Sequence, residues 1–195
     1  VAAWLRISAL EGNFINGVFF RHTSTANASR YGIQVGFNNS APWMRIGGDV
    51  GSTDINVSVP LTGFVGRTQW IHAAWVFDNA SDAVWFYRNG ILVNRQGNTR
   101  NLMADASCTT EINTSAGATG TLQGDIFDVQ ALPDVAVGPA DIPLLMNPRI
   151  LLPGVKGRWF GPQFRQPGAS GTVLDESGNG NNLTASATLA NCLQG

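Results

Sequence analysis

An all-β fold is what the sequence predicts: an antiparallel two-sheet sandwich with one short helix and an extended C-terminal arm. The 195 residues include 23 glycines and nine prolines, and Asn, Ser and Thr are also frequent, so many turns and many short strands are expected. Apolar stretches of strand length recur roughly every 8–12 residues, which is typical of a sandwich or barrel. Strands and helices do not alternate along the chain, which argues against a parallel α/β fold.

Strands are expected through most of the first 132 residues. The strand-forming stretches are Val1–Ser8, Phe14–Arg21, Ser29–Phe37, Trp43–Ile46, Asp54–Val59, Gln69–Phe77, Ala83–Arg88, Ile91–Arg95, Cys108–Asn113 and Leu122–Leu132. Gln69–Phe77 (QWIHAAWVF) and Ala83–Arg88 (AVWFYR) are the richest in β-branched and aromatic residues. Asn89-Gly90 lies between two apolar runs and predicts a hairpin, because a type I′ turn needs positive φ at both central positions.

One stretch is expected to be helical. Pro139 suits a first helical position, and the helix ends by Asn147 because Pro148 follows it. Pro143 is expected to interrupt this helix. We expect residues 1–147 to form one sandwich domain.

Residues 148–195 differ in character from the rest. They contain a Gly/Asn-rich run, Ser177–Asn182, and repeated prolines, so they are not expected to build a core alone. We interpret them as a C-terminal arm that completes the sandwich or contacts a neighbouring chain. A partly disordered tail is the other interpretation.

Composition excludes several classes of protein. The net charge is −1 and only 13% of the residues are charged, which excludes a disordered chain and a coiled coil. The near-neutral net charge gives no sign of the excess of positive charge that binding to nucleic acid or to an anionic membrane surface requires. No apolar run approaches the ~20 residues that a membrane helix needs. We therefore expect neither a nucleic acid nor a membrane as partner.

Four motifs occur in the order in which the laminin-G-like branch of the concanavalin A-like jelly rolls has them. They are an aromatic within the strand Val1–Ser8, Trp70–Asp78 (WIHAAWVFD), Tyr87–Gly90 (YRNG), and Gly124–Val129 (GDIFDV) before the short helix. The sequence resembles that family over about residues 1–147. The resemblance implies a jelly-roll sandwich that works by binding or as a structural element.

The sequence departs from the family at both ends. One or two strands that the family has before the equivalent of Val1 are missing. Val173–Asn181 resembles the segment that normally precedes those strands, and so it stands at the other end of the chain. These departures imply a permuted domain, a truncated tandem array, or an arm that completes a sandwich in cis or in trans. An unpaired sheet edge is a liability that something should cover.

The function expected from these observations is a non-catalytic surface recognition or assembly module. The tripeptide Asn147-Pro148-Arg149, after the predicted helix, resembles a feature of laminin-G-like proteins from bacteriophage genomes. We therefore expect a structural or decoration protein of a virion or another extracellular particle. The expected partners are other protein subunits, as a homo-oligomer or with capsid or shell proteins, and the expected location is extracellular or at a virion surface. A carbohydrate-binding module is the alternative, with glycans as partners.

A polysaccharide hydrolase or lyase is the third interpretation. Retaining hydrolysis needs two carboxyl groups about 5–5.5 Å apart, and related hydrolases carry two glutamates on one strand. Here Glu11, Glu111 and Glu176 are isolated from one another in sequence. We therefore expect no enzyme activity and name no catalytic residue.

Trp43, Arg45 and Asp49 are the candidate ligand-binding residues. Trp43 follows a proline and precedes a glycine-rich loop, so it is the best candidate for an exposed ring that stacks on an apolar sugar face, and a packed ring is the other interpretation. Trp4, Trp75 and Trp85 are expected in the core, and Trp159 is expected to anchor the arm.

No cofactor is expected, although Ca²⁺ stays open. Asp78 and Asp82 lie in a predicted turn and offer the hard oxygen ligands that Ca²⁺ prefers, while solvated turn aspartates are the simpler interpretation. His72 lies in an apolar strand and is expected to be a core histidine.

Cys108 and Cys192 are the two cysteines. A disulfide between them would contribute roughly 4 kcal/mol to stability, and two buried free thiols are equally consistent with the sequence.

Overall fold

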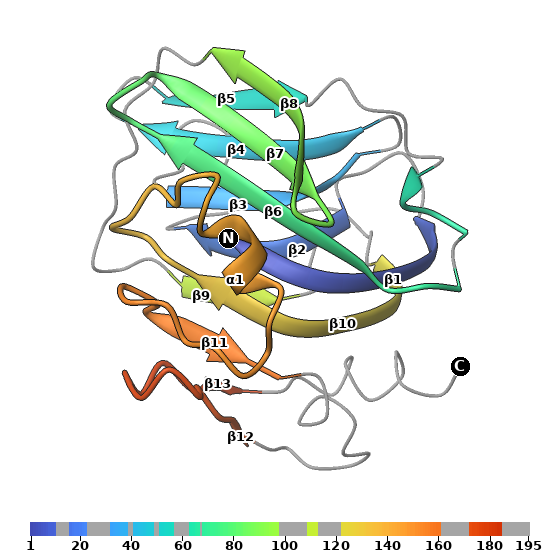
Figure 1. Ribbon diagram of the computed structural model, residues 1–195, viewed down its shortest axis with the longest axis vertical. Helices are drawn as coiled ribbons and strands as arrows, with labels where there is room; N and C mark the ends of the chain where they lie inside the picture. Colours follow the sequence, from blue (N-terminus) through green and yellow to red (C-terminus); the bar gives the residue numbers. More distant parts are fainter. Residues whose placement is uncertain are drawn as a thin grey trace.

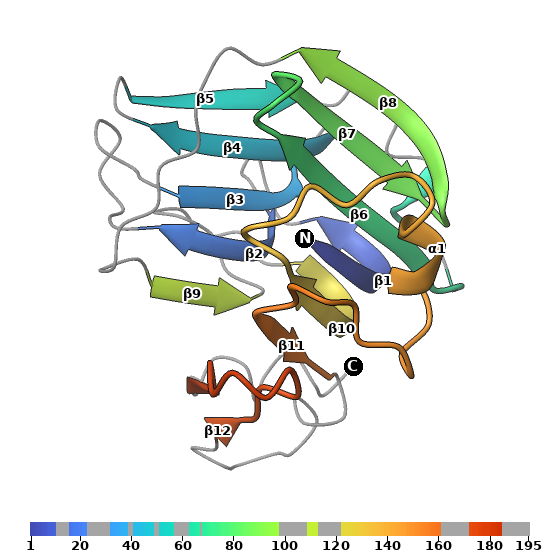
Figure 2. The same ribbon diagram turned by 60° about the vertical axis from the view of Figure 1, so that its left-hand side comes forward.

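The computed structural model describes residues 1–10, 16–22, 32–38, 41–48, 51–56, 63–66, 68–97, 109–112, 122–160 and 172–184. Its described part is a sandwich of two antiparallel sheets that face each other (Figures 1 and 2). The predicted all-β fold is confirmed. No helix among the described residues is long and apolar enough to cross a membrane.

Sheet A has six strands in the order β11-β10-β1-β6-β7-β8. Their bounds are β1 Ala2–Leu10, β6 Ile71–Asp78, β7 Ala83–Arg88, β8 Ile91–Gly97, β10 Leu122–Ala131 and β11 Gly157–Trp159. Sheet B has five strands in the order β5-β4-β3-β2-β9. Their bounds are β2 Asn16–His22, β3 Gly32–Phe37, β4 Pro42–Gly48, β5 Gly51–Asn56 and β9 Thr109–Ile112. Each predicted strand therefore has a counterpart among the described residues, while the predicted strand residues at 14–15, 29–31, 57–59, 108 and 113 lie outside the described residues.

The predicted hairpin between β7 and β8 is confirmed. Asn89 and Gly90 have φ of 50° and 79°, the left-handed values that a type I′ turn requires. The Asn89 side chain also accepts a hydrogen bond of 2.9 Å from the backbone N–H of His72. The turn is therefore tied to β6 as well as to its own two strands.

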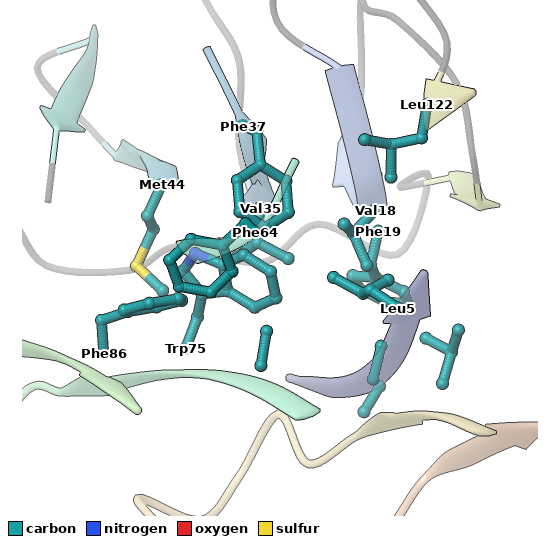
Figure 3. Packing of buried hydrophobic residues seen from close by; sticks show 14 of the residues in the cluster. Leu5, Val18, Phe19, Val35, Phe37, Met44, Phe64, Trp75, Phe86 and Leu122 are labelled. Atoms are coloured by element: carbon teal, nitrogen blue, oxygen red, sulfur yellow. The ribbon is translucent and has the colours of Figure 1, made fainter. Parts of the chain in front are cut away.

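Aromatic side chains fill the space between the sheets. Trp75 lies 5.6 Å from Phe37 and 5.2 Å from Phe86, measured between ring centroids. Phe64 lies 5.5 Å from Phe37 and 5.6 Å from Phe86. Figure 3 shows these rings pointing toward one another from the two layers. Edge and tilted contacts of this kind add to the stabilisation from apolar burial, and they fix the two sheets against each other.

A second apolar cluster covers the outer face of sheet A. Two alanines, Ala2 and Ala74, leave room on this face for side chains from the chain that follows β10. The covering side chains are Leu132, Val137, Ile142, Leu145 and Val155.

Trp75 is buried as expected, while Trp4 and Trp85 are only partly buried.

The helix α1, Ile142–Leu145, contributes to this cover. It begins after Asp141 with Pro143 in its first turn. The expectation that Pro143 interrupts the helix is wrong, because a first-turn residue does not need its N–H for a helical hydrogen bond.

The arm adds the strand β11 to the edge of sheet A. Trp159 pairs with Val129 of β10, is 2% exposed, and lies 6.0 Å from Phe19 of the opposite sheet. Its indole N–H donates to the Asn181 carbonyl. A Cβ on Gly157 would lie 2.2 Å from the Trp159 ring, so only glycine fits there. The expectation that Trp159 anchors the arm is confirmed.

A buried ion pair holds β11 in place. The Arg158 guanidinium donates two hydrogen bonds of 2.7 Å, one to each carboxylate oxygen of Asp128 on β10. A third bond of 2.7 Å goes to the Ile150 carbonyl. Both charged side chains are almost fully buried. Loss of either one would leave the other as an unpaired buried charge, which strongly lowers the free energy of unfolding.

The segment after β12 (Thr172–Val173) covers the free edge of β11. Asp175 accepts a 2.9 Å bond from the Arg158 N–H, and the Glu176 N–H donates to the Arg158 carbonyl at 2.8 Å. Burial raises the pKa of Asp175, but hydrogen bonds from Ser177, Arg158 and Asn181 bring it below its usual value. The segment then returns through β13 (Leu183–Thr184), which pairs with β12.

Replacement of Asp128 tests the role of this ion pair. Asp128→Asn should lower the free energy of unfolding by about 3 kcal/mol, because it leaves the Arg158 charge buried without a counter-ion. Asparagine tolerates the left-handed φ of 51° at this position, so the loss reports the charge and the one hydrogen bond that an amide NH2 cannot accept from Arg158. Urea denaturation at pH 7 measures it.

Asp125→Asn is the matched control. Asp125 lies on the same strand, β10, and pairs with Arg6 of β1, but these side chains are 30% and 40% exposed. The control should cost less than about 1 kcal/mol. Equal losses in the two variants would contradict the assigned role of the buried pair.

Candidate functional site

A cavity of about 410 Å³ opens at one end of the sandwich. It lies beyond the start of β1, between the last residues of β6 and those of β10; Figures 1 and 2 show the chain start between these two strands. The cavity lies beside the last residues of β6, past the point where β6 bonds to Val1. Pairing of β1 with β6 ends where Val1 bonds to Trp75, while β6 continues to Asp78.

Apolar side chains form the floor of the cavity. From between the sheets come Phe19, Ile33, Trp75, Phe77 and Trp159. From the outer side of sheet A come Val76, Leu132, Val137 and Leu145. All but Ile33 and Phe77 are buried. Phe77 is the last inward-facing residue of β6, and its ring is only partly buried, so it is the aromatic that a ligand would reach first.

The mouth of the cavity is polar and carries charges of both signs. Arg21 and Lys156 bring positive charge, and Asp78 and Asp134 bring negative charge. Asp78 is tied to its own turn by bonds from the Ala80 N–H at 3.0 Å and the Ser81 hydroxyl at 2.5 Å. The bond from Ser81 is the main reason why the pKa of Asp78 lies below its usual value. An apolar floor with a polar mouth suits an uncharged or charge-balanced ligand.

A family model described as concanavalin A-like lectin/glucanases superfamily matches residues 1–142. The chain belongs to this superfamily. The resemblance stated from the sequence motifs is therefore confirmed, and the match ends before the arm.

A solved structure supports the same fold for this concanavalin A-like chain. It is that of a candidate carbohydrate binding protein from Bacteroides ovatus, with a TM-score of 0.61 and 17% sequence identity. The alignment covers 95% of this chain and 51% of the other, so this chain spans about half of that protein's length. None of the curated proteins matches the sequence at a significant level.

Trp43 and Arg45 lie on β4, on the outer face of sheet B. The expectation that Trp43 is exposed is wrong: its side chain is 2% exposed and lies 6.3 Å from the Phe20 ring. The Arg45 guanidinium lies 5.3 Å from the Trp43 ring centroid. A ring so covered cannot stack on a sugar without rearrangement. Asp49 lies outside the described residues.

The remaining candidate residues stay predictions. Asp78 ends β6 and Asp82 lies in the turn before β7. Among the described residues no group of three His, Cys, Asp or Glu side chains could hold a metal ion. Calcium binding there stays a prediction. Cys108 and Cys192 lie outside the described residues, and their pairing stays a prediction too.

Sequence reasoning missed the cavity residues. The sequence predicts that Phe77 lies in a strand, but it does not indicate that the Phe77 ring lines a cavity. The alternation Ile71, Ala73, Trp75, Phe77 does indicate that Phe77 faces inward. No local signal indicates that the space beside it is empty.

His72 is a core histidine, as expected. It is fully buried beneath α1 on the outer face of sheet A, with its ring 5.2 Å from that of Trp4. Within the described residues neither ring nitrogen makes a hydrogen bond of normal geometry. Burial lowers the pKa of His72 to about 4, although the nearby Leu145 carbonyl opposes the shift.

This lowered pKa predicts acid sensitivity. Between pH 6.5 and 4 the unfolded chain binds a proton at His72 that the folded chain does not, so stability falls as the pH falls. From pH 8 to pH 5 the free energy of unfolding should drop by about 2 kcal/mol through this group. The measurement is urea denaturation at both pH values for the wild type and His72→Met. If the variant loses as much stability as the wild type, His72 is not the titrating group.

Proposed function

We propose that this concanavalin A-like domain is a non-catalytic recognition module whose ligand enters the cavity between β6 and β10. The cavity itself is the observation that carries the proposal. Its volume of about 410 Å³ falls in the range of ligand sites, and an apolar lining with a few polar groups at the mouth is typical of them.

The acidic groups at the cavity favour binding over catalysis. Of the described residues lining it, Asp78 and Asp134 carry carboxylates. Asp78 is occupied by two hydrogen bonds of its own turn. Its lowered pKa disfavours the protonated form that a general acid needs. The proposed role of Asp78 is therefore to shape the mouth.

The ligand that the floor suits best is a segment of another polypeptide. Buried apolar and aromatic surface is what the centres of protein interfaces contain, and Phe77 offers a partly exposed ring in such a setting. On this proposal the module joins protein subunits, in keeping with the expected assembly role. Its place in a virion or another extracellular particle stays a prediction.

A carbohydrate is the second candidate ligand. The likeness to the Bacteroides ovatus protein favours it, and the Phe77 ring could stack on an apolar sugar face. The apolar floor below that ring offers few hydrogen-bonding groups for sugar hydroxyls, which is why we place this candidate second.

Binding screens with Phe77→Ala test the proposal. The wild type is screened against a displayed random peptide library and against a glycan array. The selected ligand should bind at least about tenfold more weakly to Phe77→Ala, because a central aromatic anchor commonly contributes 1.4 kcal/mol or more. Calorimetry measures the dissociation constants, and thermal melting verifies that the variant is folded.

Trp70→Ala is the matched control, because Trp70 is a partly buried aromatic just before β6, at the opposite end from Phe77. It should change binding less than about threefold. Selection of glycans alone, with the same loss in Phe77→Ala, would replace the polypeptide with the carbohydrate candidate. A ligand that binds Phe77→Ala as tightly as the wild type would overturn the proposed site.

A further inference from the structure

Residues 132–147 form a separate layer on the outer face of sheet A. Figures 1 and 2 show this segment, with α1, on the side of sheet A that faces away from sheet B. Its buried side chains belong to the apolar cluster around Ala2 and Ala74 and not to the aromatic cluster between the sheets. The core between the sheets therefore contains no side chain of this segment, which we call the α1 cover.

His72 lies at the underside of the α1 cover. Its ring is fully buried, lies 5.2 Å from the Trp4 ring, and has the Leu145 carbonyl of α1 beside it. Within the described residues neither ring nitrogen has a bond of normal geometry. A protonated ring would carry two N–H donors, of which the Leu145 carbonyl could accept one.

No carboxylate of the described residues serves as a counter-ion to His72. The charged and titratable groups on the elements around it are Arg6 on β1, Asp128 on β10, Tyr87 and Arg88 on β7, Asp141 ahead of α1, Asp78 at the far end of β6, and the Val1 amino group. Asp128 is bonded to Arg158, Asp141 is exposed, and the Val1 amino group repels a proton on His72. A proton on His72 would therefore be a buried positive charge without compensation.

Few side-chain bonds hold the α1 cover to the sheet beneath it. Gln130 Nε2 donates to the Leu145 carbonyl at 3.0 Å, and the Trp4 indole N–H donates to the Met146 carbonyl at 3.3 Å. The Tyr87 hydroxyl and Gln130 Oε1 have no partner among the described residues. Water would satisfy such buried polar groups once the α1 cover lifts, so they favour opening.

From this arrangement we infer that the α1 cover is an acid-operated lid: a proton taken up by His72 releases α1 from sheet A while the two sheets stay packed on each other. The charged ring reaches water only when the α1 cover lifts, so proton uptake and opening occur together. Return to neutral pH removes the proton and closes the lid. The inference does not rest on the proposed function, because it concerns the outer face of sheet A and names no ligand.

Native-state hydrogen exchange followed by NMR tests the lid. The Leu145 amide, bonded to the Asp141 carbonyl, and the Trp4 indole N–H report the α1 cover, while the amides of β3 report the core. Burial lowers the pKa of His72 from 6.5 to about 4, so the opening constant should rise about 30-fold from pH 8 to pH 5. Measured rates are corrected for the pH dependence of exchange in an unfolded chain.

Protection of the two reporter groups should be lower than that of β3 at both pH values, because the α1 cover opens without the core. Equal protection of the reporters and of β3 would show that only the whole molecule opens, and it would overturn the inference. An opening constant that does not change with pH would overturn it as well.

His72→Met removes the titrating ring, and the rise should shrink to less than about threefold in this variant. His22→Met is the matched control, because His22, the other histidine, lies on β2 of sheet B. The full rise should persist there. A rise that survives in His72→Met, or one that disappears in His22→Met, would overturn the inference.

The Val1 amino group also titrates in this range, because burial lowers its pKa to about 5. Acetylation of this amino group removes its charge, and the rise should persist in the acetylated chain. Loss of the rise there would assign the effect to the amino group and overturn the inference. If His72→Met does not fold, NMR titration of the His72 ring in the wild type decides: a pKa at the ordinary value of 6.5 would overturn it.

Discussion

The buried ion pair between Arg158 and Asp128 is the interaction on which the rest of this structure depends. It fixes a three-residue strand, β11, which alone could make only a few backbone bonds to β10. With Arg158 in place, the neighbouring Trp159 lies in the core against Phe19. Trp159 and Gly157 are in turn part of the cavity lining, so the candidate site depends on a contact outside it.

Most of the fold could be predicted from the sequence because its signals are local. Strands such as Gln69–Phe77 have the alternation or the apolar run that a sheet requires, and Asn89-Gly90 specifies a turn by its backbone conformation alone. The burial of Trp43 could not be predicted in this way. Its neighbours Pro42 and Arg45 resemble a surface loop, but Trp43 lies on a sheet face where Phe20 and Gln34 are buried as well. Burial on that face is a tertiary property.

The candidate site was beyond sequence reasoning for a related reason. Its lining comes from β2, β3, β6, the chain after β10 and β11, which are far apart in the sequence, and no local pattern indicates that these segments meet around a cavity. The residues at its floor, such as Phe19 and Trp159, were expected only as core or anchor. Sequence analysis could identify side chains that pack, but not a place where the packing of the described residues leaves a cavity.

The cap on β11 makes the two edges of sheet A unequal. At one edge, Asp175 and Glu176 occupy the backbone groups of Arg158. At the other, β8 ends the sheet and Ile91 is 71% exposed. Among the described residues, a further strand could therefore pair with sheet A only beside β8. Fibre formation needs a free edge on both sides of the repeating unit, and the segment at Asp175 and Glu176 covers one of them.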